Sequence, residues 1–220
     1  MTTRPSRWRA LFETQWKWTR GVLLLIAVTT FALPLLSLRS SAGARDDSSF
    51  ISSIQAWAVG YAFVAAGLGL LVGIFSWSYD HRLRHVYALS LPVERWRYSL
   101  MRFTGGLALI SLPVATLFVS AEIVAHSSLV PPMLHAYPVA LTLRFAFAAL
   151  VAYSVFFAIS SATARTAGYI LATIGLLFVL DIVLRSAGSR IDVLGHVTDI
   201  LFAAPGLLAV FGGRWMLIDV

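Results

Sequence analysis

FTGGLALISLPVATLFVSAEIVA, residues 103–125, is long and apolar enough to cross a lipid bilayer as one helix. Such a span needs about 20 mostly apolar residues. Directly before it, Arg95, Arg97 and Arg102 stand beside aromatic residues. A basic and aromatic segment that runs into an apolar one is typical of the cytoplasmic boundary of a membrane. Residues 103–125 therefore predict a membrane protein.

Four further apolar stretches have the same character, so the sequence predicts five helical spans, at residues 21–38, 56–77, 103–125, 139–159 and 167–184. Helices are expected because lipid offers no partners to backbone polar groups. A shorter apolar segment, residues 200–212, carries Pro205-Gly206 at its centre and is expected to be a re-entrant or incomplete span. The predicted fold class is all-α: a polytopic membrane helical bundle with five clear spans plus this short sixth segment.

Composition supports the same class. Of the 220 residues, 59% are hydrophobic and 12% are charged, whereas soluble domains carry about 25% charged residues. A soluble core of this size has too little interior to hide so many apolar stretches. The chain has no cysteine, which excludes disulfides, thiolate metal sites and a cysteine nucleophile.

The basic residues predict the orientation in the membrane, because cytoplasmic segments are enriched in Arg and Lys. One side of the predicted topology carries Arg4, Arg7, Arg9, Lys17, Arg20, Arg82, Arg84, Arg95, Arg97, Arg102 and Arg165. The other side carries only Arg39, Arg45, Arg185 and Arg190. The N-terminus and the loop at residues 78–102 are therefore expected to be cytoplasmic. The net charge of +7 then indicates anionic lipid headgroups as partners and not nucleic acid.

Residues 1–20 are predicted to form an amphipathic interfacial helix that precedes a single transmembrane domain over residues 21–220. The apolar face of that helix carries Trp8, Leu11, Phe12 and Trp16. An ordinary aromatic belt at the membrane surface explains the tryptophans equally well. Residues 41–44 resemble a signal-peptide cleavage site, but the long basic start and the spans that follow favour an uncleaved chain.

Three ionisable residues fall inside the predicted spans at one depth near the outer surface: Glu122, Arg144 and Asp181. Charged groups are costly in lipid, so each needs a partner or a function. We expect them to form an intramembrane charge cluster. The cluster either ties three helices together or lines a substrate path.

The chain shows no catalytic, cofactor-binding or metal-binding constellation, so it is not expected to be an enzyme. Its single lysine, Lys17, follows no glycine-rich turn, which excludes a phosphate-binding loop. His81 and His85 have helical i,i+4 spacing but lack the third ligand and the glutamate of a hydrolytic metal site. If ATP is used, a partner subunit must bind it together with magnesium.

The loop contains a candidate docking segment, Leu91-Pro92-Val93-Glu94-Arg95-Trp96-Arg97-Tyr98. Pro92 favours extended backbone at Leu91 and a helix that begins just afterwards. That helix is expected to continue through Tyr98 into the span at residues 103–125. Orientation alone would not require its leucine, proline and aromatic residues.

Residues 89–98 resemble the loop between spans two and three in permease subunits of ATP-binding-cassette transporters of the type-2 exporter class. The resemblance implies docking of a separate ATPase subunit on residues 91–98. It also implies pairing with a second permease copy or a homologous permease, and a bacterial inner-membrane location. The family usually has six spans, and residues 200–212 depart from that pattern.

The leading functional hypothesis is therefore the membrane-spanning permease subunit of an ATP-driven transporter, with export as the expected direction. A non-transporting structural or docking subunit of a larger membrane complex is the alternative. An intramembrane enzyme is a third hypothesis, which the lack of a catalytic constellation disfavours.

Overall fold

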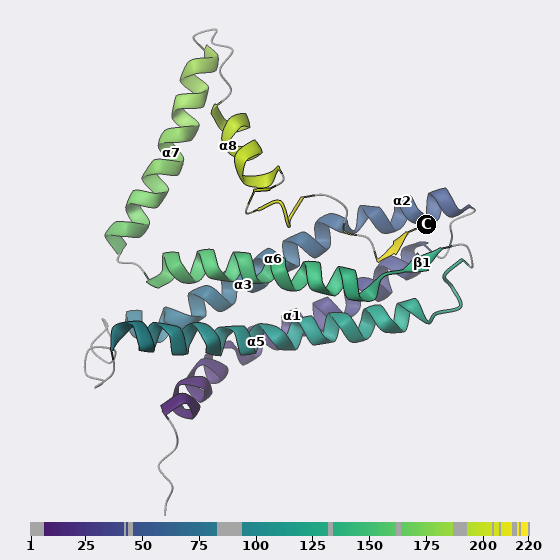
Figure 1. The fold of residues 1–220 in the computed structure, drawn as a ribbon, viewed down its shortest axis with the longest axis horizontal. Helices are drawn as coiled ribbons and strands as arrows, with labels where there is room; N and C mark the ends of the chain where they lie inside the picture. Colours follow the sequence, from purple (N-terminus) through teal and green to yellow (C-terminus); the bar gives the residue numbers. More distant parts are fainter. Residues whose placement is uncertain are drawn as a thin grey trace, which may run out of the picture. The chain divides into compact units, whose positions relative to one another are not determined.

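The described part of the chain is mostly helical, with short turns and one pair of two-residue strands (Figure 1). The structure is a computed structural model that describes residues 7–41, 43, 46–82, 94–131, 134–161, 164–186, 193–203, 205–206, 208–212, 215 and 217–219. These residues form two compact units. The first takes residues 1–157 and 214–220, and the second takes residues 158–213.

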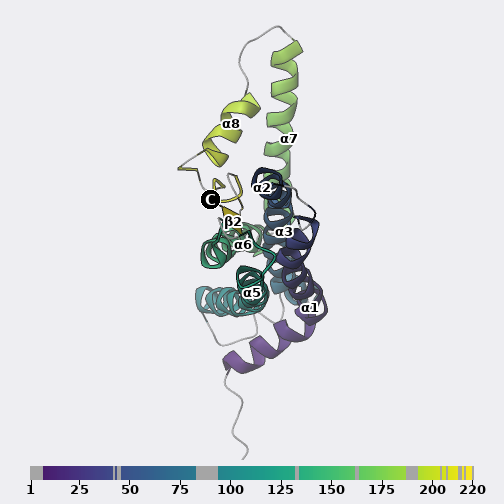
Figure 2. The same cartoon turned by 90° about the vertical axis from the view of Figure 1, so that its right-hand side faces the viewer.

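The first unit is built on four long helices and one short one. They are α1 (Arg7–Ser41), α2 (Asp47–Ala56), α3 (Ala58–Arg82), α5 (Arg95–Ala125) and α6 (Pro138–Ser161), whose last turn belongs to the second unit. Figure 2 looks nearly along α5 and α6 and shows the long helices side by side around a shared interior. The same figure shows the N-terminal turns of α1, in purple, running in a different direction from the rest of that helix.

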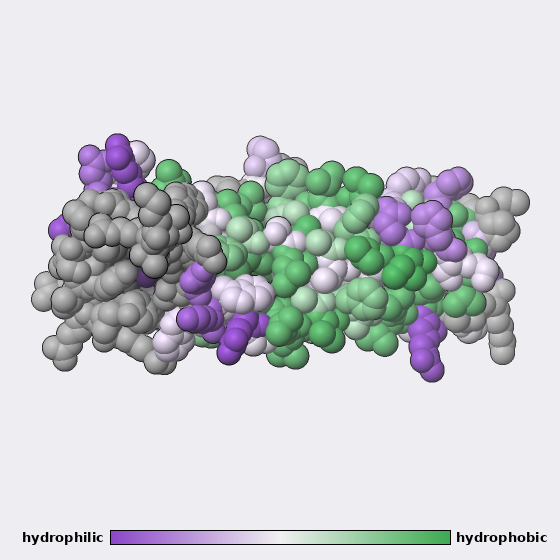
Figure 3. Space-filling view, turned by 90° about the horizontal axis from the view of Figure 1, so that it is seen from below, coloured by the Kyte–Doolittle hydropathy of each residue, from purple (hydrophilic) through white to green (hydrophobic). Residues whose placement is uncertain are grey.

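Among the described residues, four helical segments are long and apolar enough to cross a membrane: 15–41, 47–78, 95–125 and 138–161. Four of the five predicted spans are thus confirmed as apolar helices of spanning length. Figure 3 shows apolar side chains, in green, gathered over the middle of one face, with hydrophilic side chains in purple toward both ends. Such a belt suits a lipid environment.

The second unit holds α7 (Ala164–Ser186) and α8 (Val193–Phe202). Helix α7 covers the predicted fifth span, but it is not among the four segments of spanning character within the described residues. The predicted sixth segment, 200–212, is helical only up to Phe202 and continues in turns where it is described. The structure therefore does not support the prediction of five clear spans plus a sixth segment.

Two glycines of α3 allow close packing against α6. A methyl group added at Gly69 would lie 2.5 Å from the Cβ of Ala152, and one added at Gly73 would lie 3.0 Å from the Cβ of Phe156. Small residues at such positions let membrane helices approach closely. The small residues spaced four apart in α3 therefore pack within the chain.

Hydroxyl groups connect α1 and α5 deeper in the bundle. The hydroxyls of Thr30 and Thr116 lie 2.8 Å apart, and the hydroxyl of Ser120 donates to the Thr30 carbonyl at 3.5 Å. Polar contacts of this kind hold apolar helices in a fixed register, since lipid provides no competing partners.

The two strands pair residues 218–219 with the connection between α5 and α6 in the first unit. Strand β1 (His135–Ala136) pairs antiparallel with β2 (Ile218–Asp219), and the Tyr137 amide donates to the Leu217 carbonyl at 2.7 Å. Next to this pair, the Trp215 ring stacks on Tyr61 with centroids 6.5 Å apart, and the Arg144 guanidinium lies 5.1 Å from the Trp215 ring centroid. Residues 215–219 thereby join α3, α6 and the α5–α6 connection.

Candidate functional site: the start of α5 and its anchor

Helix α5 begins within the predicted docking segment. Its first residue is Arg95, preceded by Glu94, and it continues unbroken to Ala125. The predicted helix from the docking segment into the third span is thus confirmed. Leu91, Pro92 and Val93 lie outside the described residues. We call Glu94, Arg95, Trp96 and Arg97 the α5 start.

The side chains of the α5 start are exposed. The Trp96 side chain is 61% exposed, and the Arg97 guanidinium lies 5.2 Å from its ring centroid. Arg97 Nε lies 3.0 Å from a Glu94 carboxylate oxygen, in an ion pair whose two side chains are both about 60% exposed. Exposed pairs of this kind contribute only about 0–1 kcal/mol, so Arg97 can exchange this partner at little cost.

Two charges of the α5 start, those of Arg95 and Arg97, oppose the helix dipole, whereas the charge of Glu94 suits it. The first turn of α5 contains no acidic residue but carries Arg95 and Arg97. The N-terminus of a helix is itself partly positive and favours acidic side chains. Glu94, directly before the helix, offsets one of these two positive charges, and the remaining positive charge suits an acidic partner surface.

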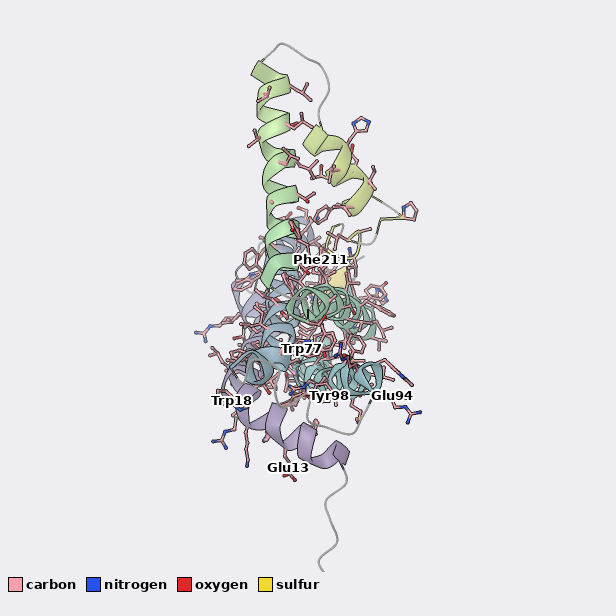
Figure 4. All side chains as sticks on the ribbon, turned by 90° about the vertical axis from the view of Figure 1, so that its left-hand side faces the viewer. Glu13, Trp18, Trp77, Glu94, Tyr98 and Phe211 are labelled. Atoms are coloured by element: carbon pink, nitrogen blue, oxygen red, sulfur yellow. The ribbon has the colours of Figure 1, made fainter. Side chains whose placement is uncertain are left out.

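Within the next helical turns of α5, two side chains are buried in the bundle. Tyr98 is buried and Arg102 is only 2% exposed. Both Nε and Nη2 of Arg102 donate to the Tyr98 hydroxyl, at 2.9 and 2.6 Å, and Nη1 donates to the Ser76 carbonyl of α3. The guanidinium also lies 5.8 Å from the Trp77 ring centroid. Figure 4 labels Trp77 and Tyr98 within the bundle and Glu94 near its edge.

The backbone of Arg102 is bonded as well. Its carbonyl accepts a hydrogen bond from Gln15 Nε2 of α1 at 3.1 Å and a longer one from the Tyr153 hydroxyl of α6 at 3.5 Å. The hydroxyl of Tyr153 has one hydrogen, and its shorter hydrogen bond goes to the neighbouring Phe103 carbonyl at 3.0 Å. Arg102 and the adjacent Phe103 carbonyl thus connect α5 to each of the other three spanning helices. We call Gln15, Ser76, Trp77, Tyr98, Arg102 and Tyr153 the Arg102 cluster.

Two adjacent glycines make this arrangement possible. A methyl group added at Gly105 would collide with the Gln15 amide oxygen, and one added at Gly106 would collide with the Tyr153 hydroxyl. Without side chains at these positions, both polar groups reach the α5 backbone.

An aromatic layer surrounds the cluster on the α3 and α6 side. The Trp77 ring packs edge-on to Tyr98 at 6.3 Å and lies 5.3 Å from Phe157, while Phe103 stacks on Tyr153 at 5.0 Å. Within the described part of the chain, Gln15 Oε1 and Trp77 Nε1 are buried without a hydrogen-bond partner. The cluster is therefore held by Arg102 and its ring contacts, not by complete pairing of every member.

The structure does not bring the predicted Glu122, Arg144 and Asp181 cluster together within either unit. Glu122 of α5 lies 3.8 Å from Nδ1 of His126, the residue directly after that helix, and Arg144 lies over Trp215. Asp181 is buried in α7 and belongs to the second unit, which is described by itself. A charge cluster of all three residues stays a prediction.

The sequence does not predict the Arg102 cluster. Arg102 was counted among the cytoplasmic loop residues, because an arginine at the end of a basic run is indistinguishable from its neighbours there. Gln15 lies on the same helical face as Trp8 and Leu11 and carries no motif. The adjacent glycines at 105 and 106 were the only signal of close approach. Within the residues that the structure describes, no group of three or more potential metal ligands occurs.

The chain matches no protein-family model, no curated protein and no solved structure.

Proposed function

We propose that the chain is the membrane-spanning permease subunit of an ATP-driven exporter, coupled to a separate ATPase subunit of the ATP-binding-cassette kind through residues 78–102. One observation supports this proposal above the others. Exposed, positively charged Arg95 and Arg97 project from the first turn of a helix whose next turn is fixed to all other spanning helices through Arg102 and the residue that follows it. When a bound partner displaces such a surface, the displacement can be transmitted to the helix bundle.

The chemistry of the α5 start suits a protein partner with acidic groups. Arginine side chains pair with carboxylates in two-point contacts, and tryptophan supplies large apolar contact area. A solvated loop would need neither an exposed tryptophan nor charges that oppose the helix dipole.

The rest of the proposal follows from the resemblance of residues 89–98. ATP and magnesium bind to the partner, and the permease works as a dimer with a second copy or a homologous permease. The N-terminus faces the cytoplasm of a bacterial cell, so that the α5 start meets an ATPase there.

Charge reversal at the α5 start tests the proposal. With Arg95→Glu and Arg97→Glu, the ATPase subunit that co-purifies with the wild-type chain in mild detergent is expected to be retained about tenfold less well, because a repulsive contact replaces an attractive one. ATP turnover by the mixture falls in parallel. Arg39→Glu is the matched control, since Arg39 is an exposed arginine in the last turn of α1, away from the α5 start.

The proposal fails if both reversals leave ATPase binding and ATP turnover at wild-type levels. A different result would favour the alternative, a non-transporting docking subunit: a partner is lost upon charge reversal, but no ATP-dependent transport occurs in vesicles that contain the intact complex.

A further inference from the structure

The Arg102 cluster lies between the α5 start and the membrane-spanning part of the bundle. Its position decides how a force on the α5 start spreads. If α5 could bend or turn at this level, a push on Arg95 or Arg97 would be absorbed locally. If α5 is fixed there, the same push displaces the whole bundle.

The bonds of Arg102 and the adjacent carbonyl fix α5 in three directions. The guanidinium holds α3 through the Ser76 carbonyl, the Arg102 carbonyl holds Gln15 of α1, and the adjacent Phe103 carbonyl holds Tyr153 of α6. Turning α5 about its own axis would move the guanidinium away from α3 and the two carbonyls away from α1 and α6 together. The cost is high, because a buried group that loses its partner retains its full desolvation penalty.

The side chain also fits its site in shape. A guanidinium has five N–H donors in a plane, which lets Arg102 donate to Tyr98 and to Ser76 at the same time. It is also flanked by the rings of Tyr98 and Trp77, at 5.1 and 5.8 Å. A lysine carries the charge but cannot reproduce the two-sided donation or the stacking.

We propose that Arg102 is a positioning residue that makes the α5 start and the four spanning helices of the first unit move as one rigid body. The rigid connection itself is independent of what binds at the α5 start. Its consequence, that Arg102 couples a motor to the membrane, rests on the proposed function.

Distance measurements between spin labels test the rigid connection. The chain has no cysteine of its own, so label sites can be introduced directly. Ile74→Cys with Leu100→Cys places labels on exposed positions of α3 and α5 near the cluster. Val59→Cys with Val119→Cys places them on exposed positions toward the other ends of the same helices.

In the Arg102→Met variant, the distance distribution of the 74/100 pair is expected to broaden, while that of the 59/119 pair stays as narrow as in the parent chain. Tyr98→Phe removes the shared acceptor but keeps the ring, and it should broaden the 74/100 distribution to a lesser degree. The inference is overturned if the 74/100 distribution is unchanged in both variants. It is equally overturned if both pairs broaden, because Arg102 would then support the fold in general and not position α5.

A second measurement tests the coupling. In the complex with the ATPase subunit, Arg102→Met should leave co-purification unchanged, because the α5 start is intact, but lower transport per ATP hydrolysed by about tenfold. Arg39→Met is the matched control and should change neither quantity. Arg102→Lys should restore part of the coupling through its charge.

The two proposals fail in different ways. If no ATPase associates even with the wild-type chain, the proposed function falls, and the spin-label distances still decide the role of Arg102. If the ATPase associates and Arg102→Met transports normally, the coupling role of Arg102 is wrong and the proposed function stands.

Discussion

Two glycines decide how α5 packs at its buried end. Gly105 and Gly106 leave room for the Gln15 amide and the Tyr153 hydroxyl to reach backbone carbonyls of α5. These carbonyls already belong to a helix and accept a second hydrogen bond, as an oxygen with two lone pairs can. A backbone atom cannot change its rotamer. Bonds to it therefore fix the helix itself and not only a side chain.

The first prediction concerns Gly106. In Gly106→Ala, the new methyl group meets the Tyr153 hydroxyl, so Tyr153 must leave the Phe103 carbonyl or α6 must move. We expect a loss of about 1–3 kcal/mol of stability, as for other overpacked interiors. The thermal unfolding midpoint of the protein in mild detergent measures the change.

Gly67→Ala is the matched control, because a methyl group at Gly67 meets nothing within 4 Å. It should be neutral or slightly stabilising, since alanine narrows the unfolded ensemble. The double variant Gly106→Ala with Tyr153→Phe should lose less stability than the two single variants together. Strict additivity would show that the methyl group is obstructed by the Tyr153 ring, whose Cζ lies 2.6 Å from it, and not by the hydroxyl.

The chemistry of this site could be predicted only in part. The exposed arginines and the start of a helix after Pro92 follow from sequence, because charge and the backbone restrictions of proline act locally. Burial of Arg102 does not, because it depends on which residues of α1, α3 and α6 face the same point. Gln15 of that set carries no sequence signal of its own.

At the scale of elements, the spanning helices follow from their apolar length, and their ends depend on neighbouring groups. The helix α1 continues through the predicted boundary between interfacial helix and first span, because no proline lies near that boundary; the proline of α1, Pro34, lies farther along, within the span. Near the other end of the bundle, α2 begins at Asp47 directly after Asp46, and α3 follows it with only Trp57 between them. Spanning length was thus predictable, whereas the division between α2 and α3 was not.

The N-terminus of α2 gives a prediction for pH. Hydrogen bonds from the Ser48 hydroxyl first, and then from Ser49, hold the pKa of the exposed Asp46 carboxyl below its usual value of about 3.9. A lowered pKa stabilises the folded state above the ordinary value, and this contribution is lost as the pH falls through the lowered one. Carboxyl-carbon NMR should therefore find that Asp46 titrates below its usual range.

The hydrogen bonds to the Asp46 carboxylate should also affect the stability of the folded state. Relative to Asp46→Asn, which cannot ionise, the wild-type chain should be more stable at neutral pH, and the difference should vanish as the pH falls below about 4. Ser48→Ala should move the pKa of Asp46 back toward its ordinary value. A pKa at or above that value in the wild-type chain would contradict the geometry of the turn.

At the scale of the molecule, the first unit is completed by residues far apart in the chain. Trp215 is 1% exposed, packs on Tyr61 of α3 and lies beside Arg144 of α6. Leu217 and Ile218 are buried as well, and β2 joins β1. No sequence pattern indicated this return, since two-residue strands have no periodicity to detect.

Trp215→Ala should therefore weaken the first unit substantially. Replacement of a fully buried tryptophan by alanine costs about 3–5 kcal/mol, because apolar contacts are lost and a cavity remains. Trp96→Ala is the matched control and should change the unfolding midpoint little, since Trp96 is exposed. Equal effects of the two substitutions would show that residues 215–219 are not an integral part of the first unit.

The stacking of Tyr61 on Trp215 also has a consequence for synthesis. Domains fold from the N-terminal side as the ribosome delivers the chain. Here the first unit cannot be completed when its helices have emerged, because residues 158–213 of the second unit must be synthesised before Trp215 arrives. Until then, the ends of α3 and α6 near Tyr61 and Arg144 lack their last contacts. A biogenesis chaperone or a pause in translation would act most strongly in this interval.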